Sequence, residues 1–165
     1  MSLSDWGEIP HRNLELAEGE ALARIIEEQK TSFQVATEKG FLKAQVAGKL
    51  LRPSVDRLLR PVVGDWVKIR ALWQEKKAVI QEVLPRSSLL RRKAAGESEA
   101  VQPLAANVSL TLIVTTLNRE FNEKRLHRYL TAAEESGSRV AVLFTKSDLI
   151  PESFACAEEI GRAHV

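Results

Sequence analysis

Val140-Ala141-Val142-Leu143-Phe144-Thr145-Lys146-Ser147-Asp148-Leu149 joins an apolar run directly to a polar one. The apolar part predicts a buried strand over residues 139–144, and a similar run predicts a second buried strand over residues 110–114. Between them, residues 123–135 have the spacing of an amphipathic helix. This order of strand, helix and strand predicts a βαβ unit that ends in Thr-Lys-Ser-Asp.

The polar residues after this strand match the needs of a guanine base. Guanine presents two neighbouring N–H donors, and one carboxylate, here Asp148, accepts both in a charge-assisted pair. Lys146 lies two residues earlier, on the same side of an extended segment, so its alkyl stem can lie along the base. We predict a guanine site of Thr145, Lys146, Ser147 and Asp148, with Thr145 bracing the loop. The alternative is a polar turn in which Ser147 or Asp148 caps a helix.

The preceding segment has the rhythm of a small β-barrel. Lys39-Gly40 predicts a hairpin turn, and Gly64-Asp65 predicts a turn into a strand, which gives both residues a structural role. We expect five strands, over residues 33–38, 41–46, 65–70, 77–83 and 88–91. Five short strands suit an oligonucleotide-binding (OB) barrel, whose exposed face and loops bind nucleic acid. Residues 15–28, within an acidic amino-terminal segment, predict a helix.

Charge is unevenly distributed along the chain. Residues 39–93 carry 14 basic and 4 acidic side chains, although the net charge of the whole sequence is only +2. Such a concentration is the footprint of a surface that meets phosphate backbones. We predict RNA contacts from the loop after the second strand and from the exit of the barrel, by Lys49, Arg52, Arg57, Arg60, Arg86, Arg91, Arg92 and Lys93. For any one of them, a solvated surface charge is the alternative.

Several short stretches, taken in order, resemble one protein family. They are Pro61-Val62-Val63-Gly64-Asp65-Trp66-Val67, Pro85-Arg86-Ser87-Ser88-Leu89-Leu90-Arg91-Arg92, Gln102-Pro103-Leu104-Ala105-Ala106-Asn107-Val108, Phe121-Asn122, Arg128-Tyr129-Leu130 and the Thr-Lys-Ser-Asp-Leu run. No single stretch is specific, but the ordered series resembles the circularly permuted GTPases called ribosome small subunit-dependent GTPase A (RsgA). The resemblance covers residues 33–151.

The resemblance implies both a fold and a function. The fold is an amino-terminal five-stranded OB barrel followed by an incomplete GTPase α/β domain of the P-loop type, in which the guanine motif precedes the phosphate-binding loop. The full-length protein would bind GTP with Mg²⁺, hydrolyse it during late maturation of the small ribosomal subunit, and contact rRNA through the barrel. The family also has a carboxyl-terminal zinc module. The partners implied are the small ribosomal subunit and its rRNA, with the full-length protein a monomer.

Motifs for phosphoryl transfer are missing from the sequence. It has no G-x-x-x-x-G-K-[ST] run and no D-x-x-G element, so no catalytic residue is assigned. One Cys and three His at wide spacing do not make a four-ligand zinc site, so no metal ligand is assigned either. We therefore expect a truncated portion of such a protein, with negligible GTP hydrolysis of its own.

The predicted organisation has five parts. These are a variable extension (1–30), the OB domain (31–93), a mobile linker (94–107), the start of the permuted GTPase domain (108–158) and a non-native tail (159–165) that resembles a translated sequencing adapter. A single Cys and the lack of a secretory signal or a long apolar run predict a cytoplasmic protein without membrane contact. Two other functions stay open: a stand-alone OB module that binds RNA without nucleotide activity, and a partner-binding scaffold.

Overall fold

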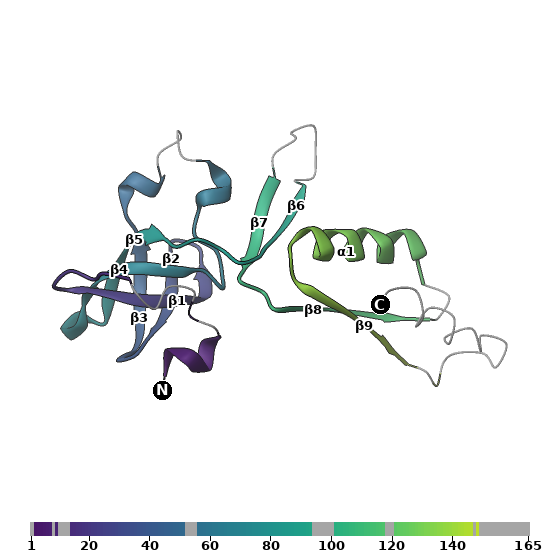
Figure 1. The fold of residues 1–165 in the computed structure, drawn as a ribbon, viewed down its shortest axis with the longest axis horizontal. Helices are drawn as coiled ribbons and strands as arrows, with labels where there is room; N and C mark the ends of the chain where they lie inside the picture. Colours follow the sequence, from purple (N-terminus) through teal and green to yellow (C-terminus); the bar gives the residue numbers. More distant parts are fainter. Residues whose placement is uncertain are drawn as a thin grey trace.

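The computed structural model describes residues 2–7, 9, 14–51, 56–93, 101–117, 121–146 and 148. Its elements are η1 (Leu3–Trp6), β1 (Glu20–Gln29), β2 (Ser32–Thr37), β3 (Gly40–Val46), η2 (Gly48–Leu51), η3 (Arg57–Leu59), β4 (Trp66–Leu72), η4 (Trp73–Glu75), β5 (Lys77–Val83), β6 (Leu89–Lys93), β7 (Val101–Ala106), β8 (Leu110–Thr116), α1 (Glu123–Glu135) and β9 (Arg139–Thr145). Figure 1 shows a barrel at one end, a βαβ unit at the other and the β6–β7 hairpin between them. Ser147, Arg52 and the tail 159–165 lie outside the described residues.

The barrel is closed, with the strand order β1-β2-β3-β5-β4. Its interior is filled by small and branched apolar side chains that point inward from alternate positions, among them Ala23, Val35, Ile69 and Ile80. A barrel of five short strands leaves room for side chains only, so this interior is a packed core. The predicted OB-type barrel is confirmed.

One barrel strand differs from the prediction. The helix expected over residues 15–28 is wrong, because residues 20–29 form β1, which pairs antiparallel with both β2 and β4. Ala, Leu, Glu and Arg favour helices locally, but pairing on both edges outweighs that preference. Ala23 and Ile25 are buried in the barrel core, so the barrel begins inside the predicted extension.

The strand expected over residues 88–91 lies outside the barrel. It is part of β6, which pairs antiparallel with β7, from Leu89 opposite Ala106 to Lys93 opposite Val101. The predicted fifth barrel strand is therefore wrong at this position, because β5 is already paired on both edges, with β3 and β4. The segment expected as a linker, residues 94–107, also differs in its second half, since β7 occupies residues 101–106.

The βαβ unit is confirmed. Strands β8 and β9 pair in parallel, from Leu110 opposite Arg139 to Thr116 opposite Thr145. Helix α1 has the predicted bounds and begins after Asn122, whose side-chain oxygen accepts a hydrogen bond from the backbone N–H of Arg125 at 2.9 Å. Leu126 and Ala133 of the helix are buried.

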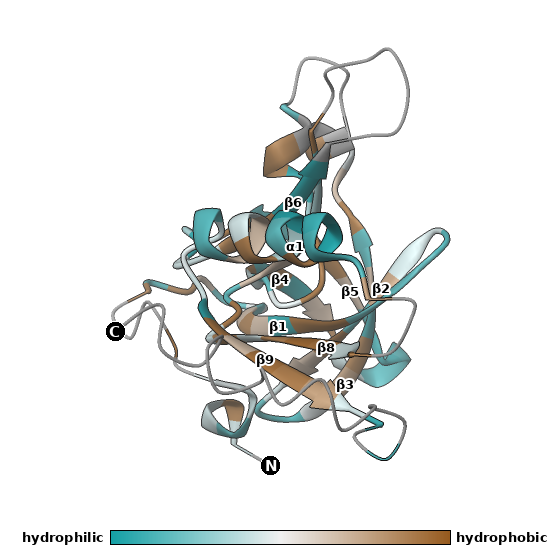
Figure 2. Ribbon diagram, turned by 90° about the vertical axis from the view of Figure 1, so that its right-hand side faces the viewer, coloured by the Kyte–Doolittle hydropathy of each residue, from teal (hydrophilic) through white to brown (hydrophobic). Residues whose placement is uncertain are grey.

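The two strands of this unit are covered on one face only. Ile113 is buried, whereas Leu110, Leu112, Val114 and Leu143 are 47–58% exposed. The prediction of two buried strands does not hold on this face, which we call the β8–β9 apolar face. In Figure 2 much of β8 and β9 has the brown of hydrophobic residues. Among the described residues, no helix combines the length and the apolar character that crossing a membrane requires.

Candidate nucleotide and RNA-binding sites

The predicted guanine site lies where β9 ends. Thr145 is the last residue of the strand, and its hydroxyl donates a hydrogen bond to the carbonyl of Thr115 on β8 at 3.3 Å. Lys146 follows with a φ of +57°, so the segment is extended only as far as Thr145. The extended segment assumed for the period-two alignment of Lys146 and Asp148 therefore ends before Lys146. Both residues are exposed.

The surroundings of this turn are those of an α/β ligand site. Thr116 is opposite Thr145 in the parallel pair, so β8 and β9 end at the same edge of the sheet. Ligands of open α/β sheets bind outside the carboxyl ends of the strands. The exposed carboxylate of Asp148 at this edge offers an acceptor for the paired N–H donors of a base.

A second candidate site is a cleft of about 840 Å³ between the barrel and β7. Its apolar lining includes Phe33, Val62 and Pro103, and two cations, Lys30 and Arg60, line it together with one anion, Glu28. Because apolar surface and positive charge are combined, the cleft suits a ligand that carries phosphates on a flat organic body, as nucleic acids do. We call it the cationic cleft.

The fold brings together cations that are far apart in the sequence. Arg60, after η3, lines the cationic cleft directly, while Arg92 pairs across the hairpin with Gln102, which lines the cleft from β7. Helix η3 itself contacts β7. Arg91 and Arg92 are exposed on β6. Lys49, Arg57 and Lys93 belong to η2, η3 and β6, and Arg52 lies outside the described residues.

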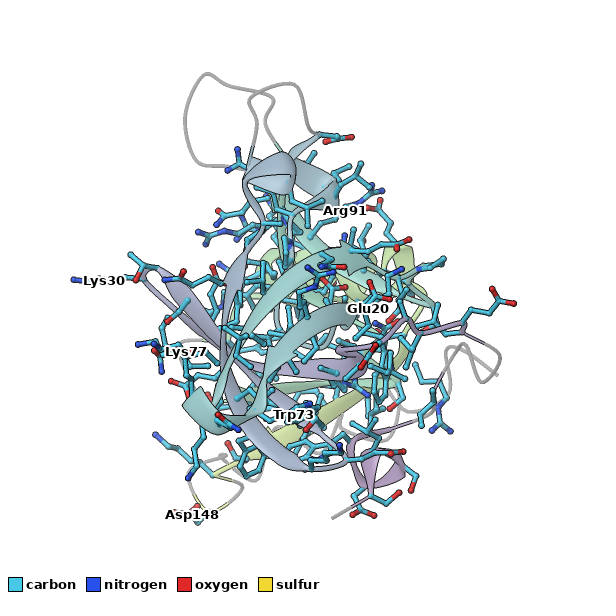
Figure 3. The ribbon with its side chains drawn as sticks, turned by 90° about the vertical axis from the view of Figure 1, so that its left-hand side faces the viewer. Glu20, Lys30, Trp73, Lys77, Arg91 and Asp148 are labelled. Atoms are coloured by element: carbon cyan, nitrogen blue, oxygen red, sulfur yellow. The ribbon has the colours of Figure 1, made fainter. Side chains whose placement is uncertain are left out.

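Lys30 was missed from the sequence. It lies in the turn between β1 and β2, and Figure 3 shows it projecting outward from the barrel. The polar pair Lys30-Thr31 between two strand-forming runs is a turn signal that could have placed Lys30 on the surface. The prediction of a helix over residues 15–28 removed the first of these strands and with it the turn. In the same view Lys30, which lines the cationic cleft, lies at the left of the barrel and Asp148 at the bottom, so the cationic cleft and the guanine site are separate places.

Arg86 departs from the expected surface role. Its guanidinium binds both carboxylate oxygens of Asp65, at 2.6 Å and 2.7 Å, and also donates to the carbonyls of Leu58 and Arg60. The Arg86 side chain is 12% exposed and that of Asp65 is fully buried. A buried carboxylate requires such a partner. We therefore leave Arg86 out of the RNA-contact set, because its donors are used inside the protein.

A second cation is also used internally. Arg24 of β1 donates to the carbonyl of Trp6 and, at 3.2 Å, to that of Asn107, and its guanidinium carbon lies 5.2 Å from the centroid of the Trp66 ring. Burial lowers the pKa of Arg24 below its usual value, while the charge of nearby Asp65 acts in the opposite direction. The Gly64-Asp65 turn has the structural role that the sequence predicts. Gly64 has a φ of +89°, and the side chain of Asp65 is buried.

Among the residues that the structure describes, no group of three or more His, Cys, Asp or Glu side chains is placed to hold a metal ion.

Known proteins match most of this chain. The model of the family described as RsgA GTPase matches residues 83–163. Small ribosomal subunit biogenesis GTPase RsgA 1 of Oceanobacillus iheyensis is 40% identical over 128 residues, which are 78% of this chain and 36% of that protein. The chain is similar to the RsgA GTPases. RsgA of Opitutus terrae is 36% identical over 149 residues, which are 85% of the chain and 40% of that protein.

Solved structures show the same fold. YjeQ from Thermotoga maritima superposes with a TM-score of 0.63 at 21% identity, over 86% of this chain and 47% of that one. YloQ, described as a circularly permuted GTPase, gives a TM-score of 0.60 at 19% identity, over 90% and 49%. The chain thus spans about two fifths of the RsgA proteins and about half of these two structures.

Proposed function

We propose that this chain is part of a GTP-binding and GTP-hydrolysing factor that acts in late maturation of the small ribosomal subunit. The observation that carries the proposal is the placement of Thr-Lys-Ser-Asp at the carboxyl end of β9, beside the end of β8. The names of its relatives, small ribosomal subunit biogenesis GTPases, supply the biological setting. In this proposal the full-length protein works in the cytoplasm as a monomer.

The guanine base is held by the turn after β9. Asp148 accepts from the two N–H donors of the base, the stem of Lys146 lies against the ring, and Thr145 fixes the strand end through Thr115. Ser147 completes the motif by sequence. Discrimination against adenine follows, because adenine presents no matching pair of donors to a carboxylate.

GTP hydrolysis itself would depend on parts that this sequence does not contain. A magnesium ion bound to the nucleotide would neutralise the phosphates, but the described residues include no group of three or more His, Cys, Asp or Glu side chains that could hold a metal ion. The sequence also lacks a Gly-rich phosphate loop. We therefore assign base recognition to this chain, derive no hydrolysis step from it and expect negligible turnover by it alone.

The rRNA contact is assigned to the cationic cleft and its rim. Arg60 and Lys30 line the cleft, and Arg91 and Arg92 extend the positive surface along β6. Lys49, Arg52, Arg57 and Lys93 complete the proposed set by sequence. Such cations contact phosphates and position an RNA without reading its sequence, so selectivity comes from RNA shape.

One observation favours the alternative of a stand-alone RNA-binding module. The cationic cleft is built from the barrel, the segment after η3 and β7, and no described residue of the βαβ unit lines it. RNA binding at this cleft would therefore not require a working nucleotide site. The two functions can be tested separately in binding experiments.

Fluorescent GDP titrated into the purified chain tests the first proposal. We expect labelled GDP to bind more tightly than labelled ADP, and Asp148→Asn to weaken GDP binding about tenfold, since one charge-assisted contact contributes roughly 1.5–3 kcal/mol. Glu135→Gln, an exposed change on α1, is the matched control and leaves binding unaltered. Equal affinity for GDP and ADP, or an unchanged Asp148→Asn variant, would favour the RNA-binding module.

A further inference from the structure

Residues 87–89, just after the barrel, hold the entry to the βαβ unit. Asn107, which precedes β8, accepts hydrogen bonds at its side-chain oxygen from the backbone N–H of Ser87 at 2.9 Å and from the Ser87 hydroxyl at 3.2 Å. The backbone N–H of Asn107 donates to the carbonyl of Ser88 at 2.9 Å. The Ser88 hydroxyl bonds both the N–H and the carbonyl of Val108, at 2.7 Å and 2.9 Å.

The same short segment also holds the far end of the unit. The N–H of Leu89 donates to the carbonyl of Ser136 at 3.0 Å, where α1 ends and the chain turns toward β9. Hydroxyl contacts continue from Ser136 to Ser138 at 2.9 Å and from Ser138 to Thr111 of β8 at 2.7 Å. Ser88 and Ser136 are both buried, so water does not compete for these bonds.

Asn107 is tied equally closely to the barrel. Its side-chain N–H₂ donates to the carbonyl of Gly64 at 2.9 Å, and its own carbonyl accepts from Arg24 of β1 at 3.2 Å. The neighbouring N–H of Ala106 donates to Val63 at 2.9 Å. A left-handed φ of +54° at Asn107 is compatible with asparagine and lets one residue bond two barrel segments as well as Ser87 and Ser88.

Two attachments fix an orientation that one would not. A single tether leaves rotation about its backbone dihedral angles, whereas bonds at both the start of β8 and the end of α1 remove that freedom. The path also connects the two candidate sites, because β7 lines the cationic cleft and runs through Asn107 into β8. The segment that the sequence predicts as a linker, residues 94–107, is thus held at its last residue, Asn107, by hydrogen bonds.

We propose that Ser88 and Asn107 are positioning residues that lock the βαβ unit to the barrel, so that the cationic cleft and the guanine site belong to one rigid body. The roles of the two sites rest on the function proposed above, but the lock does not. RNA docked on the barrel would then set the orientation of the nucleotide site directly.

Distances between spin labels test the lock without RNA or nucleotide. Labels are placed at Lys77→Cys on β5 and Lys124→Cys on α1, both exposed, after the one native cysteine is replaced by Cys156→Ser. We expect a single narrow distance distribution in this parent. In the Ser88→Ala/Asn107→Gly double variant, the distribution should broaden at least about twofold, since glycine keeps the backbone conformation but not the side-chain bonds.

Two controls separate orientation from stability. Ser88→Thr as a single change in the parent, which keeps a hydroxyl, should leave the distance distribution narrow. Thr131→Ala, an exposed change on α1, should not alter the distribution either. If the double variant does not fold, as judged by its circular dichroism, the single Ser88→Ala variant is measured in its place. A broad distribution in the parent, or an unchanged one in the folded variant, would overturn the proposal whatever the outcome of the GDP titration.

Discussion

The guanidinium of Arg86 donates two hydrogen bonds to the buried carboxylate of Asp65, at 2.6 Å and 2.7 Å. Asp65 also accepts from the backbone N–H of Val62 at 2.8 Å, and Arg86 donates to the carbonyls of Leu58 and Arg60. The Arg86–Asp65 ion pair and its hydrogen bonds thus connect three segments. These are the residues around the end of η3, the start of β4 and the residues after β5. The wall of the cationic cleft near Arg60 depends on it.

Removing this cation is predicted to destabilise the barrel strongly. Arg86→Ala leaves a buried carboxylate without its partner, which costs about 3–5 kcal/mol of unfolding free energy. Arg86→Lys should cost less, because it keeps the charge but loses the bidentate geometry. Urea unfolding followed by tryptophan fluorescence measures both, and exposed Arg92→Ala serves as the control. A stable Arg86→Ala variant would contradict the structural role.

Substitutions at two glycines distinguish the cost of backbone strain from the cost of steric overlap. Gly64 and Gly137 both have positive φ, +89° and +82°, so either change to Ala costs about 1–2 kcal/mol. A Cβ at Gly64 would lie 2.0 Å from the carbonyl oxygen of Ala106, whereas at Gly137 the nearest atom is 3.7 Å away. Gly64→Ala should therefore destabilise further, by about 1–3 kcal/mol. Thermal unfolding compares them, and equal losses would contradict the close approach.

RNA binding should depend on the cationic cleft in a salt-sensitive way. Arg60→Ala is expected to weaken binding to small-subunit rRNA and to reduce the slope of log affinity against log salt by about one unit, because one phosphate contact is lost. Lys77→Ala, an exposed cation on β5 outside the cleft, is the matched control. Filter binding across a salt series measures the slopes. Identical slopes for the two variants would argue against the cleft.

The β8–β9 apolar face should promote association of the chain as given. Leu112 and Val114 are 53% and 58% exposed on neighbouring positions of one sheet face. The double change of both residues to Thr should reduce self-association in sedimentation experiments, since exposed contiguous apolar surface favours association. Leu72→Thr, an exposed leucine on the barrel strand β4, is the control. A parent chain that stays monomeric at high concentration would contradict this prediction.

The sequence by itself determined the parts whose signals are local. Helix α1 has its predicted bounds because an Asn122 cap and a 3.6-residue apolar period stand next to each other in the chain. The hairpin at Lys39-Gly40 and the polar end of β9 follow from turn residues and apolar runs of a few positions.

Only the tertiary structure decided the parts that depend on distant partners. Residues 20–29 favour a helix locally, but the free edges of β2 and β4 make them a strand. From the sequence alone Arg86 is predicted to be a surface cation. Its buried partner Asp65 is 21 positions away, and only the fold brings the two side chains together. Arg60 and β7 meet at one cleft only after the chain has folded between them. Local propensities act over a few residues, whereas pairing, burial and charge compensation are settled by whichever segments the fold brings into contact.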